Sequence, residues 1–220
     1  MDNNPIHRFL HNETNWSELY FYKKSDVLYQ MTFVFCDRFI APYGDRTRDQ
    51  MIQAARSGKQ NIVEGFADGV TSTKTMLKLL NIARGSLHEL REDYLDYLKS
   101  RRLSIWGKTH PRYNKMLKFC KRHNELKDYE PFFQKWSDEE FCNVGITLCH
   151  IEDKLMSSYI DKIQVRFVTE GGMTEQMYKA RTGYRKAEDE ELERLRQQVL
   201  LLEAEINRLR KILKENGIIF

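Results

Sequence analysis

Prolines and glycines are scarce in this sequence, and it lacks the long apolar runs of membrane proteins. The 220 residues include 4 prolines and 11 glycines, and 41% of the residues are hydrophobic, which disfavours a disordered or all-β chain. No apolar run approaches the roughly 18–20 residues that a membrane-spanning helix needs. The first ten residues, MDNNPIHRFL, lack a basic start followed by an apolar core. The sequence therefore predicts a folded, helix-rich cytoplasmic protein without membrane contact.

Cysteine is also rare, and its spacing is not that of a zinc site. The four cysteines form no C-x-x-C pair; they are Cys36, Cys120, Cys142 and Cys149. Cys120 stands three residues before His123, and Cys149 stands next to His150, but neither pair is accompanied by a second compact pair of ligands. We expect buried, reduced thiols and no metal site.

The common catalytic arrangements of helical enzymes are missing. No glutamate stands three residues before any histidine, as di-iron bundles require. His88-Glu89 begins an H-E-x-x-H motif, but position 92 is Glu92 instead of histidine. Glu89 and Glu92 match the Glu-x-x-Glu spacing of all-helical nucleotide pyrophosphohydrolases, which hold magnesium with a facing pair of acids. Only the adjacent Glu152 and Asp153 are available for that role, so we predict no catalytic residue and no cofactor.

Four long segments carry apolar residues at three- and four-residue steps, the period of an amphipathic helix. They cover about 17–41, 45–67, 72–101 and 138–167. Asp45 is placed to cap the second segment, and Thr71 or Ser72 the third. The stretch from Ser137 to Glu140 has the pattern of a capping box before the fourth.

Short turns between such helices favour an all-α fold, an antiparallel up-down four-helix bundle over residues 17–170. Two connections, 102–110 and 128–136, flank a short helix that begins near Pro111, where a missing N–H costs little. Residues 103–136 are therefore predicted to form a basic helical insertion between helices three and four.

The stretch QAARSGKQNIVEGF at 53–66 combines small, basic and acidic residues within a helical pattern. A phosphate-binding loop would need G-x-x-x-x-G-K-[ST] between a strand and a helix, and no strand precedes Gly58. Ala54, Ala55 and Gly58 fall on one face, so we interpret them as a surface where a neighbouring helix packs closely. Asn61 is expected to be a satisfied amide within the fold.

Two separated motifs resemble a known family. They are QMIQAARSGKQNIVEGF at 50–66 and NIARGSLHEL at 81–90. The family pattern is roughly Q-x-x-R-A-x-x-S-x-x-x-N-I-x-E-G followed by A-x-x-S-x-x-E-L. The residues that fit are Gln50, Ala55, Ser57, Asn61, Ile62, Glu64, Gly65, Ala83, Ser86, Glu89 and Leu90. The usual Arg-Ala pair is replaced by Ala54-Ala55, with Arg56 one place later.

These motifs resemble the four-helix bundle family named for reading frames in ribosomal-RNA intervening sequences. The accessory variability protein of diversity-generating retroelements is similar to that family. The segment GGMTEQMYKAR at 171–181 resembles the longer variant with an added suffix region. The resemblance implies a bundle, often a five-membered ring with a basic surface, and association with nucleic acid. It implies no established enzymatic activity.

Charge is strongly segregated, although the whole chain carries only +4. Residues 99–127 hold ten Lys and Arg against one acid, a net charge of +9. Residues 128–161 hold two bases and eight acids, a net charge of −6. This asymmetry indicates either an anionic partner for the basic segment or contact between the two segments across an interface.

The segment PRYNKMLKFCKRHNELK at 111–127 is the strongest functional signal in the residues themselves. On a helical wheel its apolar side chains share one side and its cations the other, an arrangement that suits phosphate binding with little sequence preference. We predict nucleic-acid contact, with Trp106 and Tyr113 stacking on unpaired bases. The predicted contact residues are Arg101, Arg102, Trp106, Lys108, Arg112, Tyr113, Lys115, Lys118, Lys121 and Arg122. The alternatives are a solvated basic face balanced by the acidic start of the fourth helix, and docking on a protein or a membrane surface.

The C-terminal extension, residues 171–220, begins at Gly171-Gly172 and is expected to contain a short helical piece at 174–182 that ends at Gly183. Apolar residues then repeat at alternating three- and four-residue steps over 192–213. The seam consists of Leu192, Leu195, Val199, Leu202, Ile206, Leu209 and Leu213. Branched residues at a and leucines at d favour a parallel dimer. The alternative is a lone helix that folds back on the bundle.

The sequence as a whole predicts a non-enzymatic oligomer that binds RNA or DNA through a basic surface. The family resemblance implies five subunits, whereas the heptads favour two, and the heptads can also serve a protein partner. The alternative function is an interaction scaffold, in which the basic segment 99–127 docks on the acidic segment 128–161 of a neighbouring subunit without touching nucleic acid.

Overall fold

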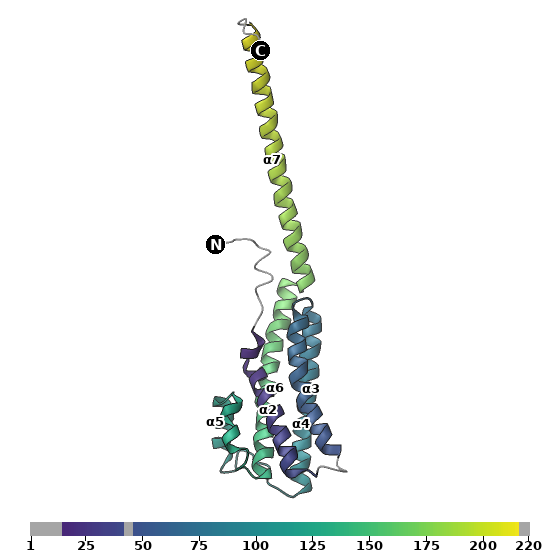
Figure 1. Cartoon of the computed structure of the whole chain (residues 1–220), viewed down its shortest axis with the longest axis vertical. Helices are drawn as coiled ribbons and strands as arrows, with labels where there is room; N and C mark the ends of the chain where they lie inside the picture. The colour runs from purple at the N-terminus through teal and green to yellow at the C-terminus, as the bar shows by residue number, and fades with distance from the viewer. Residues whose placement is uncertain (1–14, 42–45, 216–220) are drawn as a thin grey trace. The chain divides into compact units, whose positions relative to one another are not determined.

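The computed structural model describes residues 15–41 and 46–215, which form helices joined by turns and irregular connections and contain no strand (Figure 1). The elements are η1 (Trp16–Glu18), α2 (Tyr20–Phe39), α3 (Arg46–Gly69), α4 (Thr73–Ser100), α5 (Tyr113–Arg122), η2 (Leu126–Asp128), η3 (Glu130–Phe132), α6 (Asp138–Glu170) and α7 (Met173–Glu215). They divide into two compact units, a core unit that ends at Thr174 and a second unit formed by α7 from Glu175 onwards. The all-α class predicted from the sequence is confirmed.

The helix starts follow the capping signals in the sequence. The Ser72 hydroxyl accepts the backbone N–H of Thr75 at 3.2 Å at the start of α4. At the start of α6, Ser137 and Glu140 form the predicted capping box, in which each side chain accepts the backbone N–H of the other residue. The predicted cap at Asp45 lies outside the described residues.

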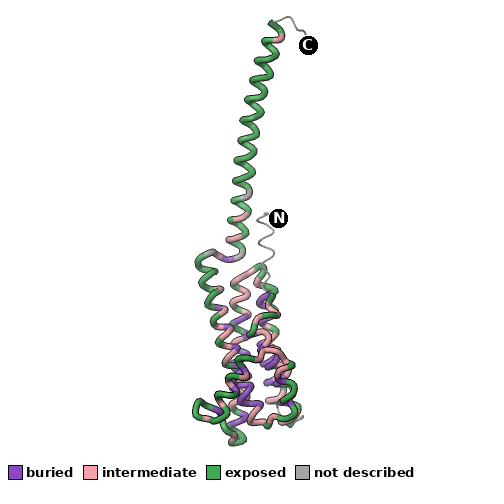
Figure 2. Tube along the Cα trace, turned by 90° about the vertical axis from the view of Figure 1, so that its left-hand side faces the viewer, coloured by how far each residue is buried: buried purple, intermediate pink, exposed green. Residues whose placement is uncertain are grey.

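Four helices, α2, α3, α4 and α6, supply most of one apolar core (Figure 2). The pairs α3·α4, α4·α6 and α2·α6 pack in antiparallel fashion. Phe35, Leu90 and Phe141 are among the fully buried side chains at the centre. Burying each such side chain contributes about 2 kcal/mol, so the apolar stripes account for the helix arrangement.

Small residues bring helices close together at two places. Gly58 of α3 faces α4, where a Cβ would stand 3.8 Å from the carbonyl oxygen of Ala83, an ordinary contact. The helices also share a polar seam there, because the Ser86 hydroxyl donates to Ser57 Oγ at 3.0 Å and Asn61 Nδ2 donates to the Ser57 carbonyl at 2.8 Å. Gly145 of α6 is tighter, because a Cβ there would stand 2.7 Å from Tyr94 Cε2 of α4. The stretch at 53–66 is therefore a helix-packing surface.

The prediction for the C-terminal extension was wrong at one point. Gly171 has a φ of 85° and ends α6 as expected, but α7 then runs unbroken through Gly183 to Glu215. A glycine inside a helix costs only about 1 kcal/mol relative to alanine. The flanking Lys, Ala, Arg and Glu residues are good helix formers, so the helix continues.

The cysteines and the apolar segments agree with the expectations from composition. All four cysteines are buried, and no disulfide joins them. Burial raises the pKa of the Cys120 thiol to about 12, because the thiolate would lose its hydration. Among residues 15–41 and 46–215, no helix combines the length and the apolar character needed to cross a bilayer.

Candidate nucleic-acid interface

The basic insertion leaves α4 through a strained residue. The N–H of Leu103 donates to the Leu98 carbonyl at 2.9 Å, and the N–H of Arg102 donates to the Lys99 carbonyl at 3.1 Å. These two bonds define a Schellman motif, whose turning residue is left-handed and usually glycine. Arg102 fills that position with a φ of 56°. A side chain in this conformation costs about 1–2 kcal/mol, so position 102 holds an arginine at the expense of local stability.

Residues 103–110 are fixed on the start of α6 by two polar side chains. Glu139 accepts the indole N–H of Trp106 at 2.8 Å and the backbone N–H of Ser104 at 3.1 Å. Asn143 Oδ1 accepts the backbone N–H of Trp106 at 2.7 Å, while its amide donates to the Ser104 carbonyl at 2.9 Å. This connection has no regular structure, and these bonds hold it in one conformation.

The short helix α5 forms where the sequence predicts it, and its apolar side packs on the core unit. Met116 and Cys120, one turn apart, are buried. Met116 Sδ lies 3.7 Å from the Thr147 hydroxyl oxygen of α6, and the Phe119 ring meets the buried Tyr129 ring edge-on at 5.1 Å. One face of α5 is therefore anchored, and its other face is available to solvent.

A buried lysine holds the end of α5. Lys24 of α2 is only 2% exposed, and its Nζ donates to the carbonyls of Cys120 at 2.5 Å and His123 at 3.1 Å. The Tyr129 hydroxyl donates to the same His123 carbonyl at 2.9 Å. A cation is favourable at a helix C-terminus, where carbonyls lack partners. Burial lowers the pKa of Lys24, an effect that the buried Glu152 opposes.

Sequence reasoning missed these supporting residues, although a signal for them existed. Lys24 lies at helical spacing from Leu28, Met31 and Phe35, so a charged residue interrupts the apolar stripe of α2. Glu152 interrupts the buried stripe of α6 in the same way, and neither carboxylate oxygen has a hydrogen-bond partner within the described part of the chain. Burial raises the pKa of Glu152 well above its ordinary value.

All eight predicted basic contact residues are exposed, and seven of them have no ion pair with any residue that the structure describes. The seven are Arg101, Arg102, Lys108, Lys115, Lys118, Lys121 and Arg122. Arg101 stacks on the Tyr97 ring at 3.7 Å. The eighth, Arg112, pairs with Glu140 at 3.0 Å. The positive charge of this surface is therefore largely uncompensated within the described chain.

The acidic start of α6 does not neutralise the basic segment. Asp138 accepts the Tyr97 hydroxyl at 3.2 Å, Glu139 holds the connection before α5, and Glu140 completes the capping box. Within the described segments, only the Arg112–Glu140 ion pair joins this turn to one of the eight predicted basic contact residues. In the alternative interpretation, the acidic start of α6 balances the basic segment within one chain. The described residues support that balance with one ion pair only.

The two aromatic residues predicted to stack on bases are placed differently. Trp106 is 8% exposed, and His110 stacks on its ring at 4.7 Å with 10° between the planes. Its indole N–H is already bonded to Glu139, so Trp106 is a buried anchor and cannot offer a free face to a base. Tyr113, at the start of α5, is half-buried. The prediction for Trp106 fails because its large apolar ring gains more from burial than from exposure.

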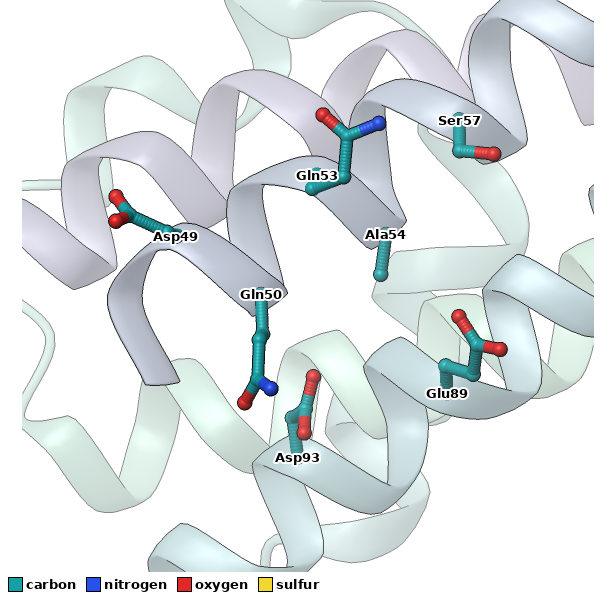
Figure 3. Close-up of a pocket in the computed structure, with 7 residues that line it drawn as sticks. All are labelled: Asp49, Gln50, Gln53, Ala54, Ser57, Glu89 and Asp93. Atoms are coloured by element: carbon teal, nitrogen blue, oxygen red, sulfur yellow. The ribbon is translucent and has the colours of Figure 1, made fainter. Parts of the chain in front are cut away.

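A groove of about 570 Å³ lies between α3 and α4 (Figure 3). Its lining consists of Asp49, Gln50, Gln53, Ala54, Ser57, Glu89 and Asp93. Three of these are acids, so the groove repels phosphate. Burial, together with the neighbouring Asp96 and Glu89 charges, raises the pKa of Asp93 to about 6.

Glu152 and Asp153, the acids that the sequence offered opposite Glu89 and Glu92, do not line this groove. Glu152 is buried in the core, and Asp153 pairs with Arg84 at 2.8 Å and His88 at 3.3 Å. Within residues 15–41 and 46–215, no cluster of three His, Cys, Asp or Glu side chains has the geometry to hold a metal ion.

The heptad positions of α7 form an exposed apolar seam. The side chains of Leu192, Leu195, Val199, Leu202, Ile206 and Leu209 are 48–63% exposed, and Leu213 is half-buried. Exposure on this scale along one helix is typical of an interaction surface. Leu200 and Leu201 are also exposed but lie off the seam.

Comparison of the chain with protein-family descriptions, curated proteins and solved structures found no match.

Proposed function

We propose that this protein is a non-enzymatic, oligomeric cytoplasmic protein that binds RNA or DNA electrostatically. In this proposal the core unit is an up-down four-helix bundle, and the insertion 103–136 is its binding element. The observation that carries the proposal is the exposed face of α5, where Lys115, Lys118, Lys121 and Arg122 have no ion pair with any described residue. A fixed row of unpaired cations is a surface for phosphates.

The binding mode follows from the geometry of α5. Ten residues span about 15 Å, which is long enough to contact a few successive phosphates. Arg101, Arg102 and Lys108 precede the helix and extend the positive charge beyond it. Phe132, which is 36% exposed and packs against Phe119 of α5, and the half-buried Tyr113 lie near these cations. Stacking of bases on such rings is tolerant of sequence, so sequence preference should be weak.

The α7 seam supplies self-association in the same proposal. In a parallel pair the heptad register places Glu191 opposite Arg196 of the second chain and Glu205 opposite Arg210. Two associated copies would present two basic surfaces. Once one surface has bound a long nucleic acid, the second is held close to it, and this high local concentration increases the overall affinity. The family resemblance instead suggests five copies, and light scattering on the full-length chain distinguishes two from five.

The decisive experiment measures binding of a labelled single-stranded RNA and a duplex DNA by fluorescence anisotropy across a salt series. If about four phosphates are contacted, the slope of log K against log salt should be near −3 for a single strand. The test variant carries Lys115→Glu, Lys118→Glu and Arg122→Glu. The matched control carries Lys154→Glu, Lys162→Glu and Lys179→Glu, which change the net charge equally at exposed positions elsewhere.

We expect the test variant to lose most of its affinity and the control to lose little. Equal losses would show that only net charge matters, and unchanged affinity in the test variant would refute the proposal. Circular dichroism should show equal helix content in both variants, since the changed side chains are exposed.

A scaffold without nucleic-acid contact is the second candidate, favoured by the long exposed seam of α7. It predicts that replacing Val199 and Ile206 by glutamate abolishes self-association or partner capture, while nucleic-acid binding is absent from the outset. Binding of RNA by the full-length chain, sensitive to the α5 variant, decides against this candidate.

A further inference from the structure

One face of α4 is exposed along its whole length. We call it the α4 outer face. It comprises Lys74, Lys78, Asn81, Ile82, Gly85, His88, Glu89, Glu92 and Asp96, all of which are exposed. With 3.6 residues per turn, these positions lie within about 60° of the direction of Gly85. No other described element buries this face, although His88 reaches Asp153 of α6 at 3.3 Å and Glu89 lines the groove between α3 and α4. The face shares no residue with the basic surface around α5.

Gly85 is an unexpected residue at the middle of a 28-residue helix. A Cβ placed there would meet nothing within 4 Å, whereas every other glycine of α3, α4 and α6 has a neighbour within that distance. Glycine costs about 1 kcal/mol relative to alanine in a helix interior. The fold itself gives no reason for this cost, but close approach of a backbone from another molecule would.

The charges of the α4 outer face are arranged symmetrically about Gly85. Two lysines, Lys74 and Lys78, lie 11 and 7 residues before it, and two acids, Glu92 and Asp96, lie 7 and 11 residues after it. If a second copy of α4 crosses antiparallel at Gly85, each lysine meets an acid of the partner. A parallel crossing would bring like charges together.

We propose that the α4 outer face is a self-complementary contact, in which a second copy of this chain packs its α4 antiparallel across Gly85. A two-fold axis through the crossing point makes every pair occur twice, so the contact carries four ion pairs. They are Lys78 with Glu92 and Lys74 with Asp96, in both directions. The apolar Ile82, 43% exposed, lies beside the crossing in each chain and is buried there together with the His88 ring of the other chain.

The electrostatics of the described chain favour this partner. Lys74 and Lys78 have no ion pair with any described residue, while Glu92 and Asp96 pair only with Arg91 and Lys99 on their own helix. The C-terminal half of the face is crowded with acids. Burial raises the pKa of the nearby Asp93, and the charges of Asp96 and Glu89 raise it further. Lysines from a second copy would relieve the repulsion between these carboxylates.

The glycine also fits the geometry of such a crossing. Helix axes normally pack 8–10 Å apart, and a residue without a side chain at the crossing point allows a closer approach. Nucleic acid is a poor alternative occupant, because the acidic half of the face repels it. The inference does not depend on the proposed nucleic-acid contact.

Cysteine cross-linking in the full-length chain tests the contact directly, since all four native cysteines are buried. One sample mixes a chain carrying Asn81→Cys with a chain carrying Glu89→Cys, which keeps Gly85 in place. Positions 81 and 89 of opposite chains lie side by side in the proposed crossing. Two copies of position 81 lie about 12 Å apart along the axis, so the Asn81→Cys chain alone is the matched control. Association of the chains through α7 would raise the disulfide yield of the mixture and that of the control equally.

We expect the mixture to form disulfide-linked dimers several-fold faster than either chain alone. A Gly85→Arg change in both chains should abolish this excess, because the side chain prevents close approach. Equal rates in the mixture and in the single-chain samples would overturn the proposal.

A charge-swap experiment gives an independent outcome. One variant carries Lys74→Glu and Lys78→Glu, and a second variant carries Glu92→Lys and Asp96→Lys. Each variant on its own should self-associate more weakly through α4, because the changes place like charges opposite each other. Mixing the two variants restores opposite charges at all four pairs, so cross-linking with the same reporter cysteines should return to the wild-type rate or exceed it. Failure of the mixture to recover would refute the antiparallel register.

Discussion

The ammonium group of Lys24 lies beneath the last turn of α5 and donates a hydrogen bond to the Cys120 carbonyl oxygen at 2.5 Å. Two segments that are 96 residues apart in the sequence are joined by this buried, charged hydrogen bond. The lysine belongs to α2, at the centre of the core unit, whereas Cys120 belongs to the basic insertion. The position of the candidate binding surface therefore depends on a residue that is itself inaccessible to any ligand.

Replacing Lys24 by methionine should destabilise the core unit by about 3 kcal/mol, because it removes a buried charge that satisfies two carbonyls. The matched control is the neighbouring Lys23→Met. Lys23 forms surface ion pairs with Glu18 and Glu125, and ion pairs at the solvent-exposed surface contribute little to stability because water and salt screen them. Urea denaturation of the three proteins measures the difference. Similar losses in both variants would contradict the role given to the Cys120 contact.

Replacing Arg102 by glycine should have opposite effects on stability and on binding. Glycine adopts a φ of 56° without strain, so the free energy of unfolding should rise by about 1 kcal/mol. The same change removes an exposed cation from the candidate surface, so affinity for RNA should fall. Lysine at this position keeps the charge and the strain, and serves as the control. A glycine variant that binds RNA as tightly as the wild type would exclude Arg102 from the contact.

Gly145 is required by the buried ring of Tyr94. A Cβ at position 145 would stand 2.7 Å from Tyr94 Cε2, and the ring cannot move freely because its hydroxyl bonds to Thr32 Oγ1 at 2.8 Å. Alanine at 145 should therefore destabilise the protein by about 2 kcal/mol through overpacking, despite its better helix propensity. Gly58→Ala is the control, since its added methyl meets only ordinary contacts. Thermal unfolding compares the two, and a neutral Gly145→Ala would show that the Tyr94 ring can shift.

The helices could be predicted from the sequence because their apolar stripes and caps are local. The α6 capping box at Ser137 and the α5 segment after Pro111 both follow from residues within one or two turns. The supports of α5 could not be predicted in this way, because the Lys24–Cys120 contact joins residues far apart in the chain. The one sequence signal for Lys24 was that its charge interrupts an otherwise apolar stripe, which indicates a buried hydrogen-bond partner.

The candidate surface was predicted in part. The cations of α5 lie on its exposed side, since Met116 and Cys120 fix which side faces the core. Trp106 was misplaced, because its acceptor Glu139 and its neighbour Asn143 come from another helix. The unbroken course of α7 through Gly183 shows that a single glycine is too weak a signal to end a helix when strong helix formers surround it.

Asp93 should make stability depend on pH between about 4 and 6. Its pKa is about 6 in the folded protein, raised first by burial and then by Asp96 and Glu89, while Asp49 of α3 lines the same groove. Because the folded pKa lies above the model-peptide value of 3.8, the folded state is favoured when Asp93 is protonated. This contribution is complete below about pH 3.8 and is lost as the pH rises through 6.

The variant Asp93→Asn cannot ionise, so it should match the wild type near pH 4 and exceed it above pH 7. The expected gain is about 1 kcal/mol, less than the full pKa shift implies, because water and salt screen a half-buried group. Urea denaturation at several pH values measures the difference, and 0.5 M salt should reduce it by screening the repulsion from Asp96 and Glu89. A gain that is the same at pH 4 and pH 8 would mean that the amide stabilises the groove for a reason other than charge.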